Sequence, residues 1–137
     1  MNALTIVHET IKRFVRDGDV CIDATAGRGY DTAFLCELVG KNGKVIAMDI
    51  QQDAVDSTNA LLESKGLCAQ VVLDSHANMA KYAEKDSVRC IVFNLGYLPK
   101  GNHGIYTHFE STKQAVESGL ELLEKGGLMC VSVYYGG

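Results

Sequence analysis

Apolar residues recur along the chain with two periods, and these periods predict helices that alternate with strands. A helical period of about 3.6 residues opens the chain and stops at the pair Asp17-Gly18. Its apolar positions are Leu4, Val7, Ile11 and Phe14. Further helices are predicted over residues 30–40, 53–65, 76–83 and 111–127, the last with a capping box from Ser111 to Gln114 and a stop at Gly126. Short apolar runs predict strands over residues 20–24, 44–50, 69–74, 88–94 and 128–135.

Strands that are apolar along their whole length and alternate with helices predict a mostly parallel sheet with helices on both faces. The fold class is therefore α/β, a doubly wound Rossmann-like sheet. A length of 137 residues with 47% hydrophobic content suits one globular domain over residues 1–137. Ligands of such sheets bind beyond the carboxyl ends of the strands, so the residues that follow each strand are the candidates for function.

Charge and composition narrow the classes of function. The net charge of -4 does not indicate a general nucleic-acid binder, although Lys12, Arg13, Arg16 and Arg28 could form either a local basic patch or a solvated face. Five scattered cysteines without a C-x-x-C motif indicate buried thiols in a reducing compartment. No apolar run approaches the ~20 residues of a membrane span, and the N-terminus lacks a signal-peptide cleavage pattern. We expect a cytoplasmic protein with no membrane contact and no metal.

A glycine turn follows the first strand, with Asp23 before it and Gly27-Arg28-Gly29 within it. Glycine allows the backbone to approach a ligand, and the next helix begins with unpaired N–H groups. A dinucleotide site is one alternative, but its fingerprint requires a third small residue where this chain has Thr32. A purely structural turn is the other.

Polar residues also end the second and third strands. Asp49 follows the glycine turn by about twenty residues, where a carboxylate can accept hydrogen bonds from ribose hydroxyls. Ser75 and His76 come at the end of the third strand, where an adenine edge would lie in the same cleft. Asp49 and Ser75 could each be a helix cap, and His76 a packed or solvated histidine. Agreement across three strand ends favours a bound nucleoside.

The stretch "DATAGRGYDT" resembles the first motif of class I S-adenosylmethionine-dependent methyltransferases. Together with "MDIQ", "LDSH", "FNLGYLP" and "VYYGG" it is similar to one narrower family, the small bacterial rRNA methylase proteins. That family includes the tRNA 5-(aminomethyl)-2-thiouridine methyltransferase. The resemblance spans essentially the whole chain, and "FNLGYLP" is its most specific string.

The resemblance implies S-adenosyl-L-methionine as cofactor and suggests a role for each matching residue. Asp23, Gly27 and Gly29 would shape the pocket for the methionine part, with Arg28 and Asp31 beside it. Asp49 and Gln51 would hold the ribose, and Ser75 and His76 the adenine side. The chain departs from the family at Arg28, where asparagine is usual, and at Tyr30, where histidine is usual.

"NLGY" resembles the Asn/Asp-Pro-Pro-Tyr/Phe motif with which many N-methyltransferases position the target amine. The resemblance implies that Asn94 accepts hydrogen bonds from the amine, that the Leu95 carbonyl assists, and that Tyr97 is a platform for the substrate base. An asparagine that only closes a turn before Gly96 is the structural alternative. The base that deprotonates the amine stays open, with His103 and His108 or solvent as candidates.

The resemblance also implies the substrate, the 5-aminomethyl group of a wobble 2-thiouridine in tRNA. An rRNA methyltransferase, a small-molecule amine methyltransferase and a non-catalytic S-adenosylmethionine-binding module stay open as alternatives.

A full class I sheet has two strands beyond the fifth, whereas this sequence stops at Gly137. We expect the last two strands to be absent, which leaves the edge of the fifth strand open and favours a homodimer or a partner that covers it.

Overall fold

The computed structural model describes residues 3–97 and 102–135, and the side chains of residues 5–95 and 110–133. Helices and strands alternate along the chain, as the apolar periods predict. The elements are α1 (Ala3–Phe14), β1 (Val20–Asp23), α2 (Tyr30–Val39), β2 (Lys44–Asp49), α3 (Gln52–Lys65), β3 (Gln70–Leu73), the 3-10 helix η1 (His76–Lys81), β4 (Val88–Tyr97), α4 (Asn102–Leu122) and β5 (Leu123–Tyr135).

The five strands form one parallel sheet in the order β3-β2-β1-β4-β5. The chain winds outward from β1 to β3 and then returns to place β4 on the other side of β1. The carboxyl ends of β1 and β4 therefore flank the point where the winding reverses, which is the usual ligand crevice of an open α/β sheet. The predicted α/β fold with a parallel sheet is confirmed.

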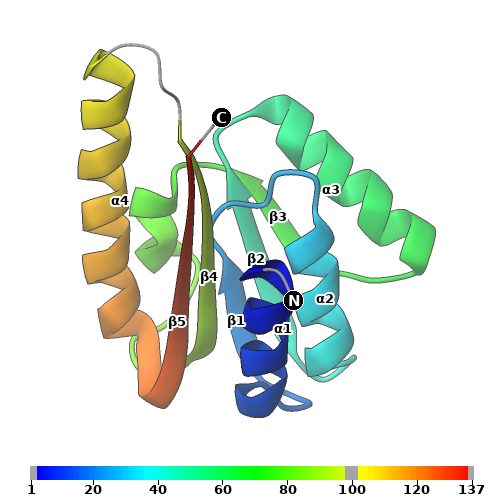
Figure 1. Ribbon diagram of the computed structural model, residues 1–137. Helices are drawn as coiled ribbons and strands as arrows, with labels where there is room; N and C mark the ends of the chain where they lie inside the picture. Colours follow the sequence, from blue (N-terminus) through cyan, green and yellow to red (C-terminus); the bar gives the residue numbers. More distant parts are fainter. Residues whose placement is uncertain (1–2, 98–101, 136–137) are drawn as a thin grey trace.

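Helices cover both faces of the sheet (Figure 1). On one face α4 and η1 pack over a cluster that includes Met79, Phe93 and Ala115. On the other face α1, α2 and α3 cover a second cluster that includes Ile11 and Leu35. The three central strands are almost fully enclosed, which explains their unbroken apolar runs.

The edge strands differ from the prediction of apolar runs buried on both faces. Leu73 of β3 is 54% exposed, and Val131 and Val133 of β5 are 48% and 52% exposed. In the described part of the chain, each edge strand pairs with a strand on one side only, and the helices packed on the centre of the sheet leave part of the edge strand uncovered. The side chain of Cys68 is also exposed, whereas Cys21, Cys36 and Cys90 are buried as expected.

The helix before β5 was predicted from Ser111, and this boundary is wrong because α4 begins at Asn102. Ser111 therefore lies inside the helix and does not cap it. A helix that is already nucleated extends at low cost, and a glycine such as Gly104 is tolerated near its first turn. The predicted end of the fourth strand at residue 94 is likewise too early, since β4 continues to Tyr97 and pairs there with Tyr135.

The predicted end of this helix at Gly126 is also wrong, because α4 ends at Leu122 and Gly126 lies at an irregularity in β5. Leu123 pairs with Val88, and the next pair joins Leu128 to Cys90. Residues 124–127 are thus looped out of the ladder, and Gly126 has the positive φ of 84° that glycine tolerates.

The apolar spacing of residues 30–40 predicts a buried face at Tyr30, Ala33, Phe34 and Leu38, and this prediction is partly wrong. The buried residues of α2 are Thr32, Ala33, Leu35, Cys36 and Val39, and Tyr30 is 64% exposed.

The spacing of residues 53–65 predicts a buried face at Ala54, Thr58, Leu61 and Leu62. The buried residues of α3 are Val55, Thr58 and Leu62, which agrees with the prediction at the last two. No helix in the described residues is both long and apolar enough to span a bilayer.

Candidate functional site

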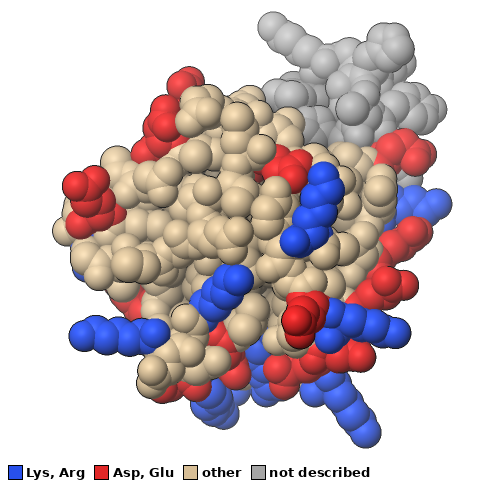
Figure 2. Space-filling view, turned by 180° about the vertical axis from the view of Figure 1, so that it is seen from behind, with Lys and Arg blue, Asp and Glu red and all other residues tan. Residues whose placement is uncertain are grey.

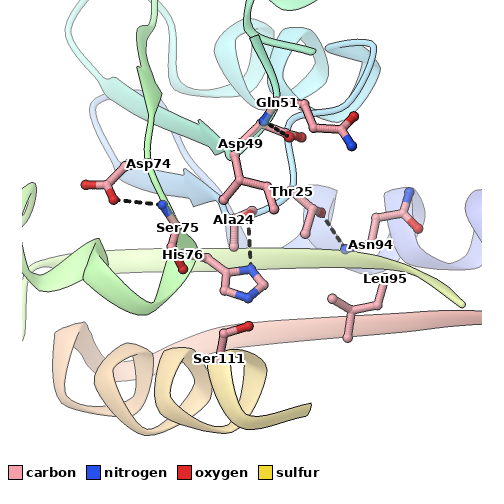
Figure 3. Close-up of a pocket in the computed structure, with 11 residues that line it drawn as sticks. Ala24, Thr25, Asp49, Gln51, Asp74, Ser75, His76, Asn94, Leu95 and Ser111 are labelled. Atoms are coloured by element: carbon pink, nitrogen blue, oxygen red, sulfur yellow. Dashed lines mark hydrogen bonds between the residues drawn. The ribbon is translucent and has the colours of Figure 1, made fainter. Parts of the chain in front are cut away.

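A cavity of about 240 Å³ lies at the carboxyl ends of β1 to β4, at the reversal point of the sheet (Figure 3). It brings together five residues that the sequence predicts for the site: Asp49, Gln51, Ser75, His76 and Asn94. The remaining lining residues are Ala24, Thr25, Ile50, Asp74, Leu95 and Ser111. Four strand ends thus contribute to one space, as the parallel topology requires.

Asp49 joins the end of β2 to the glycine turn. Its Oδ2 atom accepts the backbone N–H of Gly27 at 3.0 Å, and its Oδ1 atom accepts the N–H of Gln51 at 3.0 Å. The N-cap of α3 is Gln51, so Asp49 does not cap that helix in the usual way. A carboxylate has about four acceptor sites, and two backbone donors leave capacity for further donors from a ligand.

The glycine turn is held close to α3 by Thr58. The Thr58 hydroxyl donates to the Gly27 carbonyl at 3.2 Å. A Cβ atom on Gly29 would lie 2.9 Å from the Thr58 Cα, and Gly29 also has a φ of 92°. Both conditions exclude a larger residue, so the turn is compressed against the helix behind it.

The end of β3 is rigidified by Asp74. Its carboxylate accepts hydrogen bonds from Tyr82 Oη at 2.7 Å, Asn78 Nδ2 at 2.8 Å and the Ser75 N–H at 2.7 Å. The Tyr82 and Asn78 bonds lower the pKa of the Asp74 carboxyl. Asp74 therefore stays ionised and fixes the chain that carries Ser75 into the cavity.

Ser75 and His76 each have a structural role in addition to lining the cavity. The Ser75 hydroxyl accepts the N–H of Ala77 at 3.1 Å and so caps η1. His76 Nδ1 lies 3.2 Å from the carbonyl oxygen of Ala24, and its ring packs edge-on against Phe93. A carbonyl oxygen only accepts, which places a proton on Nδ1. Ser75 is therefore a helix cap, as the structural alternative predicts, and it also lines the cavity.

Asp23 lies beneath the cavity rather than on its surface. It is fully buried, accepts the Thr32 hydroxyl at 2.6 Å and accepts the Thr25 N–H at 3.1 Å. Burial raises the pKa of this carboxyl to about 7, against the opposing effect of the Thr32 hydrogen bond. Its described contacts are therefore to the protein, and it supports the strand end from below.

Asp31 and Arg28 also lie outside the lining. Asp31 pairs with His8 Nε2 of α1 at 2.8 Å, and the His8 ring stacks on Phe34. Arg28 is exposed in the turn after β1. The structure thus ties Asp31 to the first helix, whereas Arg28 extends toward solvent beside the turn.

The suggested basic patch is divided by β1. Lys12, Arg13 and Arg16 precede this strand and Arg28 follows it, so the two groups lie at opposite ends of the sheet. Acidic and basic side chains are interspersed on the face seen in Figure 2. The four residues therefore do not form one patch.

Asn94 lies on β4 opposite the end of β1. Its Oδ1 atom is buried and has no hydrogen-bond partner, and it is the only such side-chain atom among the described residues. Its backbone N–H donates to the Thr25 hydroxyl oxygen at 2.7 Å (Figure 3). Asn94 is paired with Ser132 inside the sheet, and its Oδ1 atom therefore does not close a turn before Gly96. The side chains of Tyr97, His103 and His108 lie outside the described residues.

A buried oxygen without a donor costs free energy, and such atoms are rare in native proteins. An acceptor of this kind inside a cavity is satisfied when a ligand brings an N–H or O–H group. The chemistry that the cavity can perform therefore includes the binding and orientation of a donor such as an amine.

Comparisons with known proteins agree with this arrangement. Residues 45–137 match the family described as "Putative rRNA methylase". The chain belongs to this rRNA methylase family.

A curated relative is the tRNA (mnm(5)s(2)U34)-methyltransferase, chloroplastic, of Arabidopsis thaliana. It is 36% identical over 145 residues, which cover 98% of this chain and 53% of that protein. The chain thus spans about half the length of this relative.

Solved structures in the same group have closely similar folds. A "putative rRNA-methylase" from Clostridium thermocellum is 46% identical, with a TM-score of 0.89 over 100% of this chain and 74% of that one. A "putative methyltransferase" from Streptococcus mutans, in complex with SAH, is 35% identical, with a TM-score of 0.80 over 94% and 72% of the two chains. The sheet of this chain is therefore that of the class I methyltransferases.

Five lining residues of this rRNA methylase family member were not predicted as site residues. Two of them, Ala24 and Ile50, are apolar, and three are polar: Thr25, Asp74 and Ser111. Thr25 and Asp74 do stand at strand ends, and this position was the available signal. Ser111 had no usable signal, because the predicted helix boundary placed it at a cap.

Proposed function

We propose that this chain is the cofactor-binding and catalytic part of an S-adenosyl-L-methionine-dependent N-methyltransferase. Its target is the 5-aminomethyl group of a wobble 2-thiouridine in tRNA. The observation that carries the proposal is the buried, unpaired Oδ1 of Asn94 at the reversal point of the sheet. The name of the Arabidopsis relative supports the substrate, and the complex of the Streptococcus protein with SAH supports the cofactor.

The residues present fit the cofactor. Asp49 has acceptor capacity left after its two backbone bonds, as the two hydroxyls of a ribose require. Gln51 lies beside it, and Ser75 and His76 line the same cavity from the end of the neighbouring strand β3. We assign Asp49 and Gln51 to the ribose and Ser75 and His76 to the adenine side.

The glycine turn is assigned to the methionine part of the cofactor. The exposed Arg28 can serve a carboxylate or an RNA phosphate, and Gly27 and Gly29 permit close approach of the backbone. Asp23 and Asp31 are assigned a supporting role for this turn. Asp23 holds Thr25 and Thr32 of α2, and Asp31 joins the start of α2 to His8 of α1. When bound, S-adenosyl-L-methionine supplies a methyl group on a positively charged sulfur.

The protein's own contribution to the chemistry is orientation of the amine. An N–H of the amine donates to Asn94 Oδ1, which fixes the direction of the nitrogen lone pair. The Oδ1 atom is buried without a partner among the described residues, so a bond to the amine satisfies it. The carbonyl of Leu95 is assigned a second N–H, and Tyr97 is assigned to stack on the base.

The open edge of β5 supports an assembly with a second chain. Among the residues that the structure describes, β5 has a neighbour only in β4, and its Val131 and Val133 side chains are about half exposed. An unpaired strand edge with apolar side chains favours pairing with another chain. We propose a homodimer that acts on RNA in the cytoplasm; light scattering that gives a strict monomer at high protein concentration would contradict the dimer.

The test is methyl transfer to defined substrates. The protein is incubated with S-adenosylmethionine and, in separate reactions, with bulk tRNA that carries the unmethylated aminomethyl group, with rRNA or with simple amines. The products are analysed by mass spectrometry. We expect the 5-methylaminomethyl nucleoside. Product from rRNA or simple amines alone would replace the substrate assignment, and cofactor binding without any product would indicate a non-catalytic module.

A further inference from the structure

The hydrogen-bond ladder between β1 and β4 changes at the cavity. Asp23 pairs with Val92 in register, and the N–H of Ala24 donates to the Val92 carbonyl at 2.8 Å. In a regular parallel ladder the next bond would join the N–H of Asn94 to the carbonyl of Ala24. Instead, the Asn94 N–H donates to the Thr25 hydroxyl oxygen at 2.7 Å, and the Ala24 carbonyl lies 3.2 Å from His76 Nδ1.

Two side chains thus replace one backbone bond. The chain after β1 bends because the Thr25 N–H donates to Asp23 Oδ1 at 3.1 Å, a local side-chain turn. Asp23 is itself held by the Thr32 hydroxyl of α2 at 2.6 Å. The end of β1 thus turns away from β4. Because a side-chain oxygen reaches farther than a backbone carbonyl, the Thr25 hydroxyl still pairs with the Asn94 N–H.

We propose that Thr25 is a positioning residue for methyl transfer: its hydroxyl fixes the backbone of Asn94 and thereby aims the Asn94 amide at the substrate amine. This inference rests on the proposed function. The amide oxygen of Asn94 has no partner of its own in the described structure, so its direction depends on the backbone that carries it. A valine at position 25 has the shape of threonine without the acceptor, and it leaves the Asn94 N–H unpaired.

The test compares Thr25→Val with Thr25→Ser, which keeps the hydroxyl. The matched control is Thr10→Val, which removes a threonine hydroxyl that bonds to Ile6 on the surface of α1. We expect Thr25→Val to lower kcat about 10-fold with aminomethyl tRNA, because one hydrogen bond is lost, with KM and calorimetric cofactor affinity within 2-fold. Thr25→Ser should keep kcat within about 3-fold of the parent, and Thr10→Val should leave kcat unchanged.

A double-mutant cycle with Asn94→Ala separates positioning from a general structural effect. If Thr25 acts through Asn94, Thr25→Val should not lower the residual rate of the Asn94→Ala protein further. An undiminished 10-fold loss in that background, or wild-type kcat for Thr25→Val alone, would overturn the proposal.

A readout without turnover distinguishes failure of this inference from failure of the proposed function. Amide hydrogen exchange followed by NMR should show faster exchange at Asn94 in Thr25→Val than in the parent or in Thr25→Ser. Unchanged exchange would overturn the inference. Faster exchange in a protein that methylates none of the tested substrates would overturn the proposed function and leave the Thr25–Asn94 bond established.

Discussion

The carboxylate of Asp49 at the end of β2 accepts the backbone N–H of Gly27, 3.0 Å away in the turn after β1. One side chain thus joins the two strand ends that we assign to the ribose and to the methionine part of the cofactor. The same carboxylate accepts the N–H of Gln51. These bonds within the protein hold the turn in place, and a turn that is ordered in advance lowers the cost of binding a ligand.

Replacement of Asp49 by alanine should weaken S-adenosylmethionine binding by on the order of 100-fold, because hydrogen bonds to a charged acceptor are lost and the turn is released. Isothermal titration calorimetry measures the change. Asp56→Ala is the matched control, since Asp56 is an exposed carboxylate of α3 that pairs only locally with Gln52 among its described contacts. Equal affinity for the Asp49 and Asp56 variants would remove Asp49 from the cofactor site.

Gly29 and Gly66 both have positive φ angles, of 92° and 66°, but only Gly29 lies against a neighbouring backbone. Gly66→Ala should cost about 1 kcal/mol of unfolding free energy from backbone strain alone. Gly29→Ala should cost about 2–4 kcal/mol, because strain and overpacking against Thr58 add. Urea denaturation followed by circular dichroism measures both, and equal losses would mean that the turn is not compressed.

Burial raises the pKa of Asp23 from the ordinary 3.8 to about 7, so folded Asp23 binds a proton that the unfolded chain has released. The contribution of this proton to stability is complete below about pH 4 and is lost as the pH rises to about 7. Relative to Asp23→Asn, which does not titrate, the unfolding free energy of the parent should fall across this window. The slope approaches about 1.4 kcal/mol per pH unit at most. Parallel curves for the two proteins between pH 4 and 7 would contradict the raised pKa.

The sheet could be predicted from sequence because apolar periodicity reports burial, and burial of whole strands occurs in the centre of a parallel sheet. Asp49, Ser75, His76 and Asn94 could be predicted to converge because the carboxyl ends of parallel strands share one edge. These inferences use only local pattern and general topology.

The predictions that failed depend on long-range packing. Ser111 was assigned to a cap because the start of α4 has no strong local signal, whereas the helix places this residue on the cavity. Thr25 was not assigned a role, since its bond to Asn94 depends on a bend after β1. Asp23 at the end of β1 produces this bend and is itself held by Thr32 of α2. The pattern of apolar residues does not predict where the hydrogen-bond ladder between β1 and β4 becomes irregular, which is at Asn94.

Asn94 carries the central claim, because its buried Oδ1 atom has no described partner in the protein. Asn94→Leu keeps a similar volume and removes an unsatisfied buried acceptor, so it should leave the thermal midpoint unchanged or higher. The same variant should lose the group that orients the amine. Asn94 should thus lower the stability of the folded protein and yet be required for methyl transfer.

The most direct measurement is steady-state turnover of parent and Asn94→Leu proteins on tRNA with the unmethylated aminomethyl group, with cofactor affinity and thermal midpoint measured on the same samples. We predict a loss of kcat on the order of 100-fold at unchanged cofactor affinity and undiminished stability. Turnover that survives in the folded, cofactor-binding Asn94→Leu protein would contradict the assignment of Asn94 to the amine.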